Sequence, residues 1–143
     1  MKQTLLIAES DAELRDIYRR FFSDRGYSVE TASDGLDCLK KLCQASPAVL
    51  VLDRELRWGG ADGVLAWLRE EAVMTELPVV LTATAACPDV AEDHEPPVVK
   101  FLAKPFTLTV LLDSVRTAVA ENGGEEPIIN RHHVSAYSEL FID

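Results

Sequence analysis

Several apolar runs in the sequence end directly on a side chain that could do chemistry. The clearest run is 48–52, Ala-Val-Leu-Val-Leu, which ends on Asp53. Other runs end on an acid, a hydroxyl or an ammonium group in the same way, at Glu9, Ser10 and Asp11, at Thr82, and at Lys104. Burying such groups together is costly unless they hold a cation and an anion. Carboxylate oxygens suit Mg²⁺, which keeps several waters and shares a phosphate, so the predicted chemistry is phosphoryl transfer onto a carboxylate.

These side chains meet only if the apolar runs are parallel strands of one sheet. An unbroken apolar run is typical of a strand covered on both faces, since a half-exposed strand alternates polar and apolar residues. We expect strands over residues 5–8, 27–31, 48–53, 78–82 and 98–102, and helices over residues 12–24, 35–44, 62–72 and 108–121. This alternation predicts an α/β fold with a doubly wound parallel sheet and helices on both faces. The carboxyl ends of the strands then share one edge, where ligands bind in such folds.

Parts of the helical pattern are less regular. We expect Ile17, Leu36 and Val110 to face the sheet, because they fall among apolar residues at helical spacing. The segment 85–97 carries three prolines and an acidic cluster, so a helix there should be short, displaced or irregular. Residues 123–143 are interpreted as a tail, with a linker followed by a segment that has the pattern of a short helix.

Composition limits the classes of function. A chain of 143 residues has the length of one domain. The formal net charge of −10 argues against nucleic-acid binding, which depends on lysine and arginine, and favours proteins or cations as partners. The sequence shows neither a signal peptide nor an apolar run long enough to cross a membrane. We therefore expect a cytoplasmic protein with no membrane partner, as a monomer or weak dimer.

Five motifs occur in an order that is typical of one family. Acidic residues follow the first strand and Asp53 ends the third, and downstream lie Asp62-Gly63, Leu81-Thr82-Ala83 and Lys104-Pro105-Phe106. Over about residues 4–122 the sequence resembles the response regulator receiver domain of two-component signalling, in the single-domain form of chemotaxis regulators. The resemblance implies a flavodoxin-like sheet of strand order 2-1-3-4-5, with a receiver domain over 1–122 and no DNA-binding or enzymatic output domain on this chain.

The resemblance also implies the residues of a metal and phosphate site. Asp53 would be the phosphoacceptor, taking the phosphoryl group from a sensor histidine kinase or a phosphotransfer protein. Mg²⁺ would be held by Glu9, Asp53 and the backbone carbonyl of Glu55, with Ser10 or Asp11 as a further candidate ligand.

Further roles follow from the same resemblance. Thr82 would be the switch hydroxyl, Lys104 would bind the phosphoryl group, and Phe101 would be the aromatic that moves on activation. Glu55 and Thr84 match positions that tune dephosphorylation. The peptide bond before Pro105 is expected to be cis, as only bonds to proline adopt that form readily.

Ser10 is the main departure from the family pattern. The family has two adjacent acids after the first strand, whereas this sequence has Glu9-Ser10, so we expect a weakened Mg²⁺ site. The loop 54–61 is also about two residues longer than is usual in the family. An alternative is therefore a pseudo-receiver, an interaction module that is not phosphorylated. A second alternative is a small hydrolase that uses Asp53 as a phosphorylated nucleophile.

Overall fold

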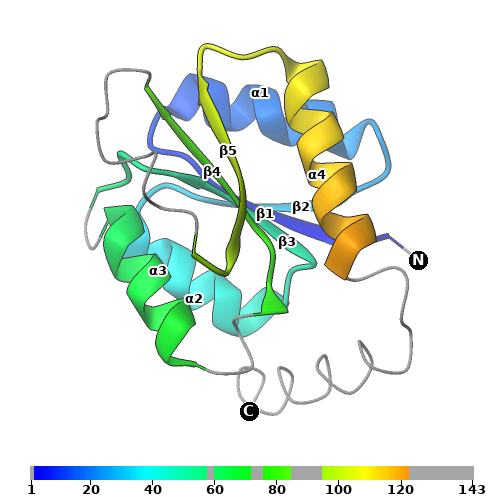
Figure 1. Ribbon diagram of the computed structural model, residues 1–143. Coiled ribbons are helices and arrows are strands. Elements are labelled where there is room, and N and C mark those ends of the chain that lie inside the picture. The colour runs from blue at the N-terminus through cyan, green and yellow to red at the C-terminus, as the bar shows by residue number, and fades with distance from the viewer. Residues whose placement is uncertain (1, 58–59, 72–75, 85–94, 123–143) are drawn as a thin grey trace.

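The computed structural model describes residues 2–57, 60–71, 76–84 and 95–122. Within these ranges, five strands form one parallel sheet in the order β2-β1-β3-β4-β5 (Figure 1). The strands are β1 (Thr4–Ala8), β2 (Ser28–Ala32), β3 (Val49–Asp53), β4 (Val79–Thr84) and β5 (Val98–Lys104). This confirms the flavodoxin-like doubly wound sheet, since the chain reverses its direction of winding after β2.

Helices cover both faces of the sheet (Figure 1). Those in the described ranges are α1 (Ala12–Ser23), α2 (Gly35–Ala45), α3 (Gly60–Glu70) and α4 (Leu108–Asn122). α1 and α4 bury residues against one face, and α2 and α3 against the other. Most of the segment 85–97, predicted to hold a short or irregular helix, lies outside the described residues, as does the tail 123–143.

β3 is the centre of the core. All five of its residues are buried, and their side chains alternate between the two helix layers. Leu50 and Leu52 join the cluster with α2 and α3, while Val49 and Val51 join the cluster with α1 and α4. The apolar run before Asp53 is therefore explained by a strand that is covered on both sides.

The predicted sheet-facing positions of three helices were partly wrong. Ile17, Leu36 and Val110 are 41%, 66% and 42% exposed. In α2 the buried positions are Gly35, Cys38 and Leu42, which share one side of the helix. Leu36 is one residue beyond Gly35 and so points about 100° away from that side.

Core and surface leucines should differ sharply in their effect on stability. Leu52→Ala should lower the free energy of unfolding by about 2–5 kcal/mol, because it leaves a cavity between β3 and the α2–α3 layer. Leu36→Ala is the matched control and should change it by less than about 0.5 kcal/mol, because that side chain is largely exposed. Urea denaturation of both variants measures the difference. Equal losses would contradict the assignment of the core.

Candidate functional site

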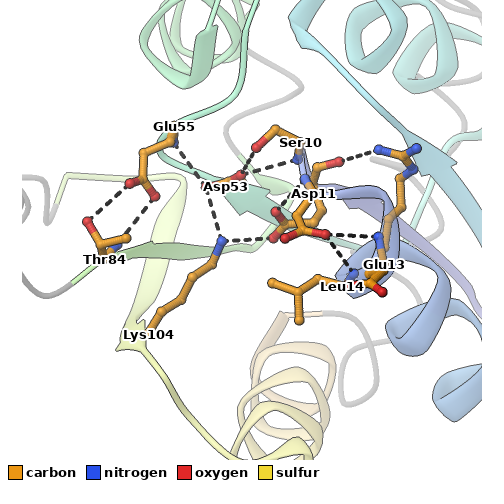
Figure 2. Close-up of polar contacts among 10 residues, drawn as sticks. Ser10, Asp11, Glu13, Leu14, Asp53, Glu55, Thr84 and Lys104 are labelled. Atoms are coloured by element: carbon orange, nitrogen blue, oxygen red, sulfur yellow. Dashed lines mark hydrogen bonds and ion pairs between the residues drawn. The ribbon is translucent and has the colours of Figure 1, made fainter.

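Figure 2 shows several of the side chains singled out from the sequence together at the carboxyl edge of the sheet, among them Ser10, Asp53 and Lys104. Glu9 follows β1, Asp53 ends β3, and Thr82 lies beside Asp53 in the register of β3 and β4. Lys104 ends β5 and reaches back toward β1 and β3, so that its ammonium contacts both carboxylates. Parallel pairing thus brings together residues that are distant in the sequence.

Asp53 is buried, with 1% of its surface exposed. Its Oδ1 accepts a hydrogen bond from the backbone N–H of Glu55 at 3.0 Å and lies 3.5 Å from the Lys104 ammonium. Its Oδ2 accepts from both the backbone N–H and the hydroxyl of Ser10, at 3.2 Å and 2.8 Å. Burial alone would raise the pKa of Asp53, but these donors and the charge of Lys104 together lower it. The carboxylate is therefore held in its ionised form.

Glu9 and Lys104 form the second half of the charged cluster. Glu9 is 2% exposed, and its Oε1 accepts a hydrogen bond from the Lys104 ammonium at 3.0 Å. Burial raises the pKa of Glu9, and the charge of Asp53 adds to the effect, while the donors on Glu9 oppose it. Burial would lower the pKa of Lys104, but the two carboxylates raise it overall, so the ammonium stays protonated. One cation is thus shared by two buried anions.

Ser10 and Asp11 have different positions although they are neighbours. The Ser10 side chain points to Asp53, whereas the Asp11 carboxylate caps α1 by accepting from the backbone N–H of Glu13 and Leu14 at 2.9 Å and 3.2 Å. The backbone N–H of Asp11 donates to Glu9 Oε2 at 3.0 Å. Of the two further candidate metal ligands, Ser10 and Asp11, only Ser10 has a side chain that contacts Asp53, the candidate phosphoacceptor.

The two threonines of β4 differ in their partners. Thr82 is 1% exposed, and its hydroxyl finds no hydrogen-bond partner among the described residues. Thr84 is exposed, and its backbone N–H and hydroxyl donate to the Glu55 carboxylate at 3.3 Å and 3.1 Å. These two bonds connect the loop after β3 to the end of β4.

Phe101 and Pro105 complete the set of predicted residues. Phe101 is partly buried and packs against the core cluster of α2 and α3. The Lys104–Pro105 peptide bond is cis, as predicted.

Two contacts around the site were not predicted. Arg15 of α1 donates from Nη1 to the backbone carbonyl of Glu9 at 2.8 Å. Its spacing of four residues from the cap Asp11 places it on the same side of the helix, which is the only sequence signal for this contact. In the loop after β3, the carbonyl of Arg57 accepts from the backbone N–H of Gly35 at 2.7 Å, so the loop is bonded to the start of α2.

The donor chemistry of the site fits a Mg²⁺ ion only with help from water. The carboxylates of Glu9 and Asp53 lie close enough to share one ammonium, and such hard oxygen donors suit this ion, which keeps several waters. Within the described part of the chain, no three or more histidine, cysteine or acidic side chains form a metal-binding group. The site therefore offers two carboxylates rather than three.

Comparison with known proteins identifies the family. The family profile of the response regulator receiver domain matches residues 5–116. The chain belongs to this family. The response regulator MprA of Mycobacterium bovis is 30% identical over 127 residues, which cover 88% of this chain and 54% of that protein. The receiver domain thus spans about half the length of such curated relatives.

Solved structures show the same fold. The chemotaxis response regulator CheY4 of Vibrio cholerae matches with a TM-score of 0.75 at 23% identity, covering 82% of this chain and 99% of that one. The receiver domain of a signal transduction histidine kinase from Syntrophus aciditrophicus matches with a TM-score of 0.77 at 21% identity, covering 87% and 96%. None of the helices that the structure describes could span a membrane.

Removing the shared cation should destabilise this receiver domain in a pH-dependent way. Lys104→Met leaves two buried carboxylates without a cation partner and should lower the free energy of unfolding by about 3 kcal/mol at pH 7.5. Without the positive charge of Lys104, the pKa of Glu9, which burial already raises, should rise further, and the pKa of Asp53 should also rise. The loss should then shrink as the pH falls to 5 and the carboxyls become protonated.

Urea denaturation at both pH values tests this expectation. Lys100→Met, an exposed lysine of the same strand, is the control and should change little at either pH. A loss for Lys104→Met that does not depend on pH would contradict the shared-cation description.

Proposed function

We propose that this receiver domain accepts a phosphoryl group on Asp53 from a histidine kinase or a phosphotransfer protein and signals by protein contact. The observation that carries the proposal is the state of Asp53, which is 1% exposed but has a lowered pKa. A buried carboxylate that stays ionised beside an ammonium is suited to act as a nucleophile toward phosphorus. In the transfer, an Asp53 oxygen forms the new P–O bond while the P–N bond of the donor phosphohistidine breaks, and the imidazole leaves.

The surrounding side chains support this reaction. The Lys104 ammonium would neutralise the oxygens of the phosphoryl group as their charge develops. The Thr82 hydroxyl is next to Asp53 in the β3–β4 register and has no other described partner, so it can donate to a phosphoryl oxygen. Such a contact would exist only in the phosphorylated state, and Phe101 is the aromatic expected to respond to it. A bond of this kind biases a two-state equilibrium.

Glu9, Asp53 and the backbone carbonyl of Glu55 would hold Mg²⁺ at this site. When bound, the ion would supply positive charge to the phosphoryl oxygens. Ser10 stands where the family has an acid, so one negative charge is missing and we propose a weakened affinity.

Glu55 and Thr84 are proposed to tune the lifetime of the phosphoryl group. The Glu55 carboxylate is held by both donors of Thr84, which fixes it at the side of the site instead of leaving it mobile over Asp53. Access of water to the acyl phosphate would depend on this arrangement.

The pseudo-receiver remains the second candidate, and one observation favours it. Ser10 already donates twice to Asp53, so the carboxylate is satisfied without metal or phosphate. The hydrolase has no comparable support, since receiver domains are signalling modules rather than metabolic enzymes. The identity of the partners remains a prediction. The cytoplasmic location and the oligomeric state, a monomer or a weak dimer, remain predictions as well.

Phosphorylation can be tested with a small phosphodonor. Incubation with phosphoramidate and Mg²⁺ should add one phosphoryl group, detected by intact mass spectrometry. Asp53→Asn should abolish the adduct because the amide is a poor nucleophile. Asp113→Asn, an exposed acid of α4, should keep it. Absence of any adduct on the wild-type protein would refute the proposal and leave the pseudo-receiver.

Restoring the missing acid should strengthen the metal site. Ser10→Asp supplies a further carboxylate near Glu9 and Asp53, so the Mg²⁺ affinity should rise about tenfold or more. Titration followed by isothermal calorimetry measures the change in Kd. A pseudo-receiver predicts instead that neither the wild type nor Ser10→Asp binds the ion.

A further inference from the structure

Four donors of the protein itself face the Asp53 carboxylate, three of them in hydrogen bonds and the fourth, the Lys104 ammonium, in an ion pair at 3.5 Å. An ionised carboxylate has about four lone-pair positions. In this receiver domain they face the backbone N–H of Glu55 and the ammonium of Lys104 on Oδ1, and the N–H and O–H of Ser10 on Oδ2. To bind a cation or attack a phosphorus atom, Asp53 needs a lone pair, so one of these donors must withdraw.

The four donors differ in how easily they can leave. The N–H groups of Ser10 and Glu55 belong to the main chain and move only with their loops. The Lys104 ammonium is held by Glu9 at 3.0 Å as well as by Asp53. The Ser10 hydroxyl depends on a single side-chain torsion, and Ser10 is only partly buried. Rotation about that bond frees one lone pair of Oδ2 and leaves the backbone unchanged.

We propose that the Ser10 hydroxyl is a latch on Asp53 that must rotate away before Oδ2 can coordinate a cation. Ser10 is then a positioning residue that acts through Asp53, and it competes with the metal instead of binding it. The inference rests on the proposed role of Asp53 and adds a regulation of that site. It also gives Ser10 a role opposite to that of the acid in the family, which would supply charge to the ion.

The latch and the ligand roles predict opposite effects of removing the hydroxyl. If the hydroxyl competes, Ser10→Ala leaves Oδ2 with one donor and an open lone pair, so Mg²⁺ should bind more tightly. A hydrogen bond to a charged group is worth about a tenfold change in an equilibrium or more, and we expect up to about tenfold here. If the hydroxyl is a ligand, its loss should weaken binding.

The test is a calorimetric titration of the unphosphorylated full chain with MgCl₂. Ser10→Ala should lower the Kd by up to about tenfold, whereas Ser10→Thr keeps the hydroxyl and should keep the wild-type Kd. Ser23→Ala, an exposed serine at the end of α1, controls for a general effect of losing a hydroxyl. A Kd for Ser10→Ala that is equal to or higher than that of the wild type overturns the latch. A lack of Mg²⁺ binding in all variants also overturns it.

Thermal unfolding provides an independent readout. In the presence of EDTA, Ser10→Ala should have a lower Tm than the wild type, because a hydrogen bond to a buried carboxylate is lost. MgCl₂ should raise the Tm of Ser10→Ala by more than it raises that of the wild type, since tighter binding to the native state stabilises more. An equal rise in both proteins would assign Ser10 a merely structural role and overturn the latch.

The latch and the proposed function can fail separately. The titration needs no phosphoryl group, so tighter Mg²⁺ binding by Ser10→Ala supports the latch even if phosphoramidate leaves Asp53 unmodified. Conversely, a phosphorylated wild type with weaker binding by Ser10→Ala would keep the proposed function and refute the latch.

Discussion

Glu9 and Asp53 are buried acids at the ends of neighbouring strands, and the Lys104 ammonium is the cation that lets both remain in the fold. Glu9 directly follows β1, Asp53 ends β3 and Lys104 ends β5, so the ion cluster joins the first and last of the described strands at the carboxyl edge of the sheet. The geometry of the cluster depends on the parallel register of the strands. The apolar residues between the sheet and the helix layers exclude water from the side of the cluster that faces the core. The net charge of the three groups is negative, so this edge of the sheet attracts a small cation. A doubly charged anion such as a phosphoryl group can be held there only when further positive charge is supplied.

Much of this arrangement could be predicted from residue types. The apolar run that ends on Asp53 indicates a strand buried on two faces, and the position of an acid at its carboxyl end follows from the geometry of parallel sheets. The neighbouring positions of Asp53 and Thr82 follow in the same way, because both residues were expected to end central strands, although β4 continues to Thr84. These inferences succeed because burial on both faces leaves few alternatives for a strand.

Other features depend on side-chain geometry that residue types do not determine. Leu36 was expected to face the core because it is apolar, but the buried side of α2 carries Gly35, Cys38 and Leu42. Ser10 was interpreted as a missing charge, whereas its donors complete the hydrogen bonding of Asp53. The bonds from Thr84 to Glu55 join two positions for which the resemblance implied a shared role but no contact. Each of these contacts depends on a side-chain torsion angle or on which side of a helix faces the sheet.

The hydrogen bond from Gly35 to the carbonyl of Arg57 links the loop after Asp53 to the start of α2. Both of its atoms belong to the main chain, so replacement of the Arg57 side chain removes neither of them. Substitutions in this loop can therefore accumulate during evolution without detaching it from the helix, provided that the backbone path is kept. The side chains of the loop can therefore change in chemical character while its anchor on the scaffold is inherited.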